Sequence, residues 1–274
     1  MDEVVVVVGS FDDLRSRQVR FLEEASKLGS LHVLLWSDGI ARRLDGQNLK
    51  FSQEERLYLL QAIRYVTQVT LVSEQRTRDV IPQVAGIQPD VWAVDEASNS
   101  AQRRAYCEAR GIAYHVVGKE ALRGYPVPPG APFTQRSPQR KVIVTGCYDW
   151  FHSGHVRFFE ETSALGDLYV VVGHDQNVRL LKGEEHPMFP QDERRYMVQS
   201  VRYVKQALIS TGHGWMDAEP EIARIKPDIY AVNEDGDKPE KRAFCQEHGL
   251  QYVVLERTPK AGLPKRASTN LRGF

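Results

Sequence analysis

Two histidines three residues apart, His152 and His155, are the side chains of this chain best suited to chemistry. They follow an apolar run that ends at Gly146 and precede a helical pattern of apolar residues. The sequence therefore predicts a strand, a tight loop and a helix, with His155 near the helix start. Free N–H groups at a helix N-terminus favour anions, and imidazoles add donors. We expect this loop to bind a nucleoside triphosphate.

Other residues of the same loop suit a nucleotide. Gly146 permits a turn of the backbone, and Gly154 lets a phosphate approach it. Asp149 can orient a backbone group or a histidine, and Tyr148 lies beside it in the sequence. Cys147 is interpreted as a small packing residue, because no base with an orienting partner can be identified around it. The alternative for the two histidines is an ordinary pair, one of them a helix cap.

Charged and polar residues follow the later strands. Lys182 precedes Gly183 on what we expect to be a mobile loop, where it could reach phosphate oxygens; a solvated lysine is the alternative. Asp235 could hold a base, a sugar or magnesium, or belong to a solvated Asp-Gly turn. His174 and Asp175 follow the second strand of this half, and we expect them to contact the second substrate.

The C-terminal segment offers a further anion site. Arg257 and Thr258 follow the last predicted strand. Ser268 can cap a short helix whose N–H groups, together with the hydroxyls of Ser268 and Thr269, would receive an anion. A frayed basic tail is the alternative interpretation.

Composition excludes several classes of protein. The 274 residues contain 36 basic and 36 acidic side chains, and this balance gives no sign of nucleic-acid binding. The apolar run at residues 4–8 is too short to span a membrane and follows two acids, so we expect neither a membrane segment nor a signal peptide. Three widely spaced cysteines fit a reducing cytoplasm, and no zinc-ligand spacing occurs.

The chain contains two copies of one unit. Residues 9–29 match residues 146–166 at 11 of 21 positions, with a shift of 137. The shift later becomes 138, which places residues 64–66 on residues 202–204. We expect a first domain at 1–122, a Pro-rich linker at 123–139 and a second domain at 140–274.

Strands and helices alternate in both halves. This alternation predicts an α/β fold, with two tandem Rossmann-like domains whose parallel sheets carry helices on both faces. In the second half we expect strands at 141–146, 168–173, 206–210, 228–233 and 251–255. The helices expected between them lie near 155–165, 191–202, 216–224 and 238–248.

The two copies differ at the residues proposed for chemistry. The first copy has Arg15 and Gln18 where the second has His152 and His155. Its counterpart of Lys182 is an acid, Asp45. We therefore expect the second copy to carry the active site and the first copy to be degenerate.

These motifs resemble those of the nucleotidyltransferase superfamily with an HxGH motif, and most of all its cytidylyltransferase-like members. The run from Gly146 to His155 is similar to the pattern G-x-F-D-x-x-H-x-G-H. Lys182-Gly183 with the residues that follow resembles K-G-x-x-x-F-x-x-E-E-R, and the C-terminal Arg-Thr and Ser-Thr pairs resemble R-T-x-G-x-S-T. The resemblance covers residues 141–274, and residues 1–118 more weakly.

The resemblance implies transfer of CMP from CTP to a phosphorylated alcohol or sugar, with release of pyrophosphate and with Mg²⁺ accompanying the nucleotide. It implies that His152, His155 and Lys182 act on the triphosphate, and that Arg257, Thr258, Ser268 and Thr269 bind the nucleotide. The run Arg179 to Gly183 looks more like heptose-phosphate adenylyltransferases, so ATP with a sugar phosphate is one alternative. A non-catalytic nucleotide-binding regulatory protein is the other.

Members of this superfamily often form dimers. The resemblance therefore implies an internal pseudo-dimer, in which residues 64–66 face residues 202–204. The same kind of pairing is open to two chains, as a homo-oligomer.

Overall fold

The chain forms two compact units, Met1–Gly124 and Tyr125–Phe274. The computed structural model describes residues 3–46, 48–127 and 138–271, with the side chains of residues 269 and 270 excepted. The boundary between the units falls inside the segment predicted as a linker, of which residues 128–137 lie outside the described residues.

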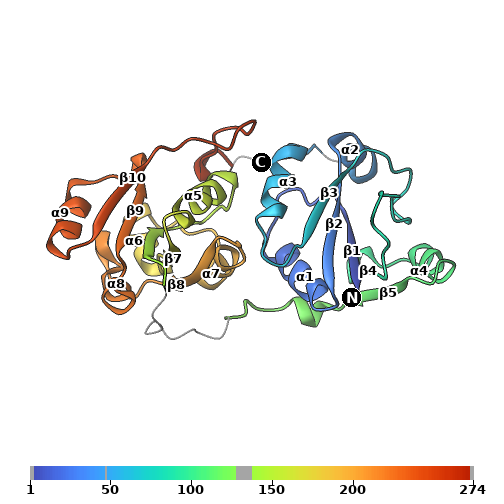
Figure 1. Ribbon diagram of the computed structural model, residues 1–274, viewed down its shortest axis with the longest axis horizontal. Helices are drawn as coiled ribbons and strands as arrows, with labels where there is room; N and C mark the ends of the chain where they lie inside the picture. The colour runs from blue at the N-terminus through green and yellow to red at the C-terminus, as the bar shows by residue number, and fades with distance from the viewer. Residues whose placement is uncertain (1–2, 47, 128–137, 272–274) are drawn as a thin grey trace. The chain divides into compact units, whose positions relative to one another are not determined.

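The second unit is built on a parallel five-stranded sheet with the order β10-β9-β6-β7-β8 (Figure 1). Its strands are β6 (Lys141–Gly146), β7 (Asp167–Val172), β8 (Val204–Ile209), β9 (Ile229–Asn233) and β10 (Gln251–Leu255). The chain runs outward from β6 to β7 and β8, and then returns to place β9 on the other side of β6. The strand order therefore reverses between β6 and β9, which is where open α/β sheets bind ligands.

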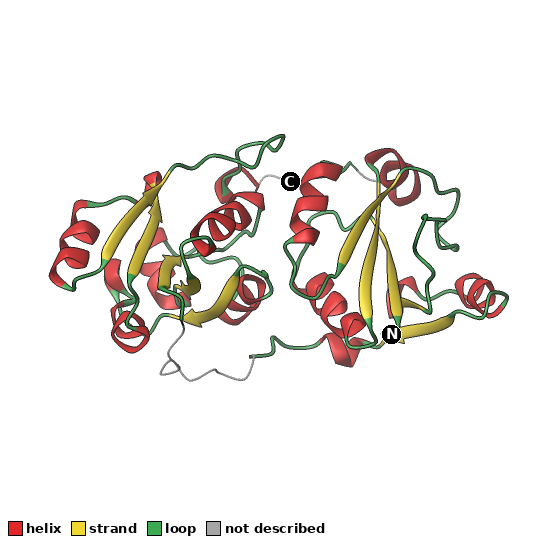
Figure 2. Ribbon diagram, viewed as in Figure 1, coloured by secondary structure: helices red, strands yellow, loops and turns green. Residues whose placement is uncertain are grey.

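Helices flank this sheet (Figure 2). They are α5 (Ser153–Ser163), α6 (Asp175–Lys182), α7 (Gln191–Gln199), α8 (Glu219–Ile225) and α9 (Pro239–Glu247), with 3-10 turns η3 (Gly214–Met216), η4 (Glu234–Gly236) and η5 (Ser268–Leu271). Ile222 of α8 and Cys245 of α9 share a core with Ile143, Tyr169 and Tyr230 of the strands. The predicted α/β class with parallel sheets is confirmed.

The first unit has the same topology, with the strand order β3-β2-β1-β4-β5. Its strands are β1 (Val4–Gly9), β2 (Ser30–Trp36), β3 (Gln68–Val72), β4 (Val91–Asp95) and β5 (Ala113–Val117). Its helices are α1 (Ser16–Ser26), α2 (Asp38–Asp45), α3 (Gln53–Gln61) and α4 (Ala101–Glu108), with 3-10 turns η1 (Glu96–Ser98) and η2 (Lys119–Leu122). Strand β1 therefore takes the central place that β6 takes in the second unit.

A buried arginine fixes the loops at the carboxyl edge of each sheet. The guanidinium of Arg194 donates to the carbonyl oxygens of Cys147, Gly173 and Phe189. It also pairs with the Asp175 carboxylate, at 2.8 Å. Arg56 makes the corresponding contacts in the first unit, with Ser10, Trp36, Phe51 and Asp38. Because four hydrogen bonds from one planar group join several segments in each unit, these loops are preorganised.

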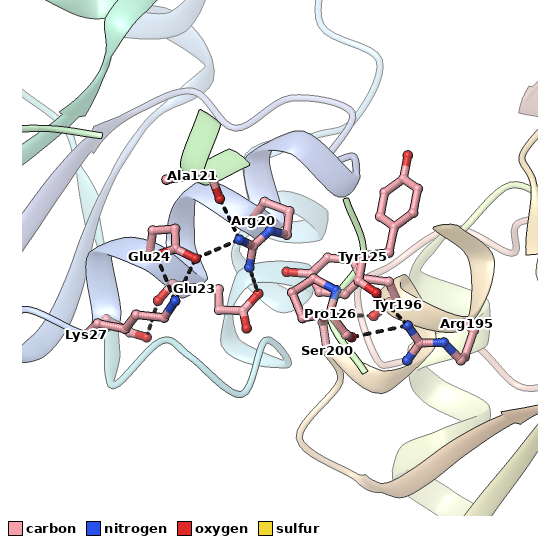
Figure 3. Close-up of polar contacts among 11 residues, drawn as sticks. Arg20, Glu23, Glu24, Lys27, Ala121, Tyr125, Pro126, Arg195, Tyr196 and Ser200 are labelled. Carbon is pink, nitrogen blue, oxygen red and sulfur yellow. Dashed lines mark hydrogen bonds and ion pairs between the residues drawn. The ribbon is translucent and has the colours of Figure 1, made fainter. Parts of the chain in front are cut away.

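Short segments next to the unit boundary are fixed within their own units. In the second unit, Arg195 Nη2 donates to the carbonyl oxygens of Tyr125, at 2.9 Å, and Pro126, at 3.1 Å (Figure 3). In the first unit, Arg20 Nη2 donates to the carbonyl oxygen of Ala121, at 2.5 Å, and to Glu24, at 2.6 Å (Figure 3). An arginine of each unit therefore fixes the backbone of that unit close to the boundary.

Helix α6 is absent from the sequence prediction, which placed Lys182 on a mobile loop. Lys182 is instead the last residue of α6, and Gly183 ends the helix with a positive φ of 98°. The prediction was wrong because α6 buries Asn177 and Val178 but exposes Leu180 and Leu181. An apolar pattern that faces solvent does not have the spacing expected of a helix packed on a sheet.

Candidate active site

A cavity of about 230 Å³ opens where the strand order of the second sheet reverses. Its walls come from the ends of β6 and β9, the loop after β6, the start of α5 and the end of α6. The C-terminal segment adds Arg257 and Ser268. The cavity brings together His152, His155 and Lys182, which the sequence singled out for chemistry.

The two histidines are held by the first turn of α5. His152 is the N-cap residue, and its Nδ1 accepts a hydrogen bond from the backbone N–H of Gly154, at 3.1 Å. The Nδ1 of His155 accepts from the backbone N–H of His152, at 3.4 Å. The two rings stack with centroids 3.9 Å apart. Because Nδ1 is an acceptor in both rings, we assign the hydrogen of each neutral imidazole to Nε2.

The surroundings of these rings favour their neutral form. Burial lowers the pKa of His152 to about 3, and the nearby charges of Arg257 and Arg266 act in the same direction. Burial also lowers the pKa of His155 well below its usual value, with His152, Arg257 and Lys182 adding to the effect. Among the described residues, the buried Nε2 of His152 has no hydrogen-bond partner. A buried donor of this kind is costly unless a ligand accepts from it.

The glycines of the loop are required by ring packing. A Cβ at Gly154 would lie 2.9 Å from Cε1 of His152, because that ring lies against the first turn of α5. A Cβ at Gly146 would lie 2.8 Å from the ring of Tyr148. The backbone of Tyr148 has a φ of 53°, which residues other than glycine rarely adopt. This conformation turns the loop. The sequence analysis explained Gly146 by a turn and Gly154 by the approach of a phosphate. The packing of the two rings adds a steric reason for a glycine at each position.

Asp149 fixes the loop after β6 to the loop before α7. Its Oδ1 accepts hydrogen bonds from the backbone N–H groups of Met188, at 2.7 Å, and Phe189, at 3.1 Å. Its Oδ2 lies 3.4 Å from Nδ1 of His186. In the first unit, Asp12 accepts the corresponding pair of backbone hydrogen bonds. Since both units have this contact, it supports the loop conformation whether or not histidines are present.

The C-terminal segment reaches the cavity through charged contacts. Arg257 Nη1 lies 2.5 Å from the Asp235 carboxylate, and Arg257 Nη2 donates to the carbonyl oxygen of Arg266, at 2.8 Å. Ser268, the first residue of η5, donates its hydroxyl to the carbonyl oxygen of Trp150, at 3.2 Å. These contacts connect the segment to the end of β9 and to the loop that carries the histidines.

Sequence comparison identifies the family. Residues 143–262 match the family described as cytidylyltransferase-like. The FAD synthase of Thermococcus kodakarensis is 34% identical over 133 residues, which cover 47% of this chain and 87% of that protein. The chain belongs to the cytidylyltransferase-like family. It is a nucleotidyltransferase, and the predicted resemblance to the HxGH superfamily is confirmed.

Two more relatives and one solved structure are similar. The FAD synthase of Ferroglobus placidus is 38% identical over 119 residues, 42% of this chain and 74% of that protein. That of Pyrococcus horikoshii is 37% identical over 134 residues, 47% of this chain and 87% of that protein. A lipopolysaccharide core biosynthesis protein from Thermoplasma volcanium aligns at 25% identity with a TM-score of 0.38, covering 44% of this chain and 98% of its own.

Not all of the residues singled out from the sequence reach the cavity of this nucleotidyltransferase. Thr258 lines a neighbouring crevice together with Arg157. His174 caps α6, with Nδ1 accepting from the N–H of Asn177, at 3.2 Å, and Asp175 pairs with Arg194. The backbone of Thr269 belongs to η5, while its side chain lies outside the described residues. Burial raises the pKa of the Cys147 thiol, which agrees with a packing residue.

Lys241, on α9, is a cavity residue that the sequence analysis missed. Its Nζ donates to the carbonyl oxygen of Gly236, at 3.1 Å, and burial lowers its pKa. In the sequence, Lys241 belongs to a charged run that resembles the exposed face of a helix. The comparison of the two copies offered a signal, because the counterpart, Arg103, is also basic.

Two further properties of the described residues bear on ligands. They contain no group of three or more His, Cys, Asp or Glu side chains placed to hold a metal ion. Within residues 3–46, 48–127 and 138–271, no helix is long and apolar enough to cross a membrane.

Proposed function

We propose that the second unit transfers AMP from ATP to flavin mononucleotide, forming FAD and releasing pyrophosphate. The observation that carries the proposal is the pair of stacked, neutral histidines, His152 and His155, in a cavity that also contains Lys182 and Arg257. The choice of substrates follows from the relatives, which are named FAD synthases. FAD consists of AMP joined to flavin mononucleotide, so its synthesis requires ATP rather than the CTP favoured by the sequence motifs.

The reaction joins two phosphate groups. An oxygen of the flavin mononucleotide phosphate attacks the α-phosphorus of ATP in line. A new P–O bond forms as the bond from the α-phosphorus to the oxygen bridging toward the β-phosphorus breaks, and pyrophosphate leaves with that oxygen. This chemistry requires positioning and charge stabilisation rather than a nucleophilic side chain.

Each part of the cavity has a task in this proposal. The Nε2–H groups of His152 and His155 donate to phosphate oxygens, whose negative charge grows in the transition state. Because their low pKa values keep both rings neutral, the histidines donate hydrogen bonds without transferring protons. Lys182 and Arg257 supply positive charge to the triphosphate and the departing pyrophosphate.

We propose that Mg²⁺ enters with ATP, bound to the phosphate oxygens. Mg²⁺ commonly binds through substrate phosphates and one or two carboxylates rather than in an all-protein site. The cavity carboxylates of the described chain, Asp149 and Asp235, are engaged by backbone N–H groups and by Arg257. Because both carboxylates already have partners, they fit an ion that would be held mainly by the phosphates of the nucleotide. The positive charge of that ion would further neutralise the phosphates.

Pyrophosphate release from a matrix of substrates tests this function. The full chain is incubated with Mg²⁺ and either ATP or CTP, each with flavin mononucleotide, glycerol 3-phosphate or a sugar 1-phosphate. We expect rapid release with ATP and flavin mononucleotide, accompanied by FAD. Pyrophosphate release only with CTP and the alcohol phosphate would show that the acceptor is that alcohol phosphate and not the flavin. Release only with ATP and the sugar phosphate would likewise show that the acceptor is the sugar phosphate. Nucleotide binding without turnover in any mixture would show a non-catalytic protein.

A further inference from the structure

The first unit contains a cavity of its own, of about 240 Å³. It lies at the carboxyl ends of β1 and β4, where the strand order of the first sheet reverses. Shifts of 137 and 138 residues relate many of its lining residues to those of the active-site cavity. Gly9 corresponds to Gly146 and Phe21 to Phe158, for example. The degenerate unit has therefore kept a cavity at the place where the fold binds ligands.

The polar groups of this cavity do not suit a triphosphate. Gln18 stands at the position of His155, and Asp45 at that of Lys182. Asp95, at the end of β4, replaces Asn233. Two carboxylates thus stand where the active-site cavity has an ammonium and an amide. Neither carboxylate can neutralise a triphosphate, as the ammonium of Lys182 can in the second unit.

The positive groups of the cavity are partly neutralised. Arg78 Nη2 lies 3.2 Å from Asp45 Oδ1. Arg103 Nη1 donates to the carbonyl oxygen of Ser98, at 2.6 Å, and Arg103 Nε lies 3.4 Å from Asp79. Each guanidinium lies near a carboxylate, Arg78 near Asp45 and Arg103 near Asp79, so the cavity has no excess of positive charge to attract phosphates.

Part of the remaining wall of the cavity is aromatic. Phe11, Phe21 and Trp36 line it, and the indole of Trp36 is held by a hydrogen bond from Nε1 to Gln75. Aromatic side chains stack on flat rings, while carboxylates accept hydrogen bonds from neighbouring hydroxyls, as they do from a ribose. We propose that this cavity binds an uncharged nucleoside, that is, a flat heteroaromatic ring with a hydroxylated chain and no phosphate. This inference does not depend on the reaction proposed for the second unit.

Equilibrium dialysis of the full chain tests the proposal, with adenosine and riboflavin as uncharged probes and ATP as the charged comparison. Two variants alter the first cavity: Asp45→Lys, which introduces the residue of the second unit, and Gln18→Ala, a milder change. The matched control, Lys182→Ala, alters the second cavity. Circular dichroism and the urea midpoint verify that each variant is folded.

We expect saturable binding of at least one uncharged probe. Asp45→Lys should weaken it about tenfold or more, as loss of a hydrogen bond to a charged group does. Gln18→Ala should also weaken it, Lys182→Ala should leave it unchanged, and Asp45→Lys should leave pyrophosphate release intact. Absence of saturable binding for both probes would overturn the proposal. So would binding that Lys182→Ala abolishes, or binding that both first-cavity variants leave unchanged.

Discussion

The rings of His152 and His155 stack with their centroids 3.9 Å apart, and each accepts a backbone N–H at Nδ1. Two imidazoles this close would repel each other if both were protonated. Burial and the neighbouring arginine and lysine charges keep their pKa values low, so the pair presents two neutral Nε2–H donors.

Replacing His155 should reduce turnover without removing nucleotide binding. His155→Asn should lower kcat by about 100- to 1000-fold, because one preorganised donor to the transition state is lost. Steady-state pyrophosphate release measures the effect. Gln18→Asn, at the corresponding position of the first unit, is the control and should leave kcat unchanged. A fall of less than threefold in His155→Asn would remove the histidine from the mechanism.

The stability of the second unit should decrease in mild acid. The unfolded chain protonates both histidines near pH 6.5, whereas the folded chain resists protonation because its pKa values are lower. The unfolded state therefore binds more protons below pH 6.5, and stability present above that pH is lost as the pH falls toward 3. The loss should approach about 1 kcal/mol per pH unit for each histidine.

Urea unfolding at pH 7 and pH 5 measures this dependence. A His152→Asn, His155→Asn double variant should show a flatter dependence than the unmodified chain, because the carboxylates common to both titrate in the same way. Equal slopes for the two proteins would show that the histidines are protonated in the folded state.

Replacing Asp149 and replacing Asp12 should have similar effects on stability and different effects on activity. Each accepts two backbone hydrogen bonds across its loop, so an alanine at either position should cost about 1–3 kcal/mol of unfolding free energy. Asp149→Ala should also lower kcat, because the histidine loop loses its anchor, while Asp12→Ala should leave kcat unchanged. Urea unfolding and pyrophosphate release test the pair. Full activity in Asp149→Ala would mean that the loop is held by other contacts.

Lys182 should contribute to catalysis through its charge. Lys182→Met should lower kcat/KM for ATP by about 10- to 100-fold, the range expected for a charged hydrogen bond to phosphate. Arg179, in the same last turn of α6, is the matched control, because it is a basic residue of that turn that does not line the cavity. If Arg179→Met were as damaging as Lys182→Met, the effect would reflect general electrostatic attraction rather than a specific contact.

The sequence predicts the sheet better than the details of the site. The strands are short and apolar, and the inner ones are buried, so their places could be predicted to within about two residues. The histidine loop could be recognised because a strand and a helix flank it. Helix α6 could not be predicted, since it exposes Leu180 and Leu181. Lys241 could not, because its charged run resembles a solvated helix face, and only tertiary folding turns it toward the cavity.

The sequence likewise predicts the class of reaction better than the substrates. The motifs predict a nucleotidyltransferase, but the base and the acceptor depend on contacts that spacing does not specify. His174 and Asp175, chosen as acceptor residues, are engaged in capping α6 and pairing with Arg194. A capping histidine and a ligand-binding histidine have the same sequence signature at the end of a strand.

Transfer of label from ATP tests the central claim most directly. The full chain is incubated with Mg²⁺, flavin mononucleotide and ATP labelled at the α-phosphate, and labelled FAD is separated by chromatography. We predict label in FAD for the unmodified chain and for Gln18→Asn, and a loss of at least about 100-fold for His155→Asn. Undiminished labelling of FAD by His155→Asn, or no labelling of FAD by the unmodified chain, would contradict a flavin adenylyltransferase site in the second unit.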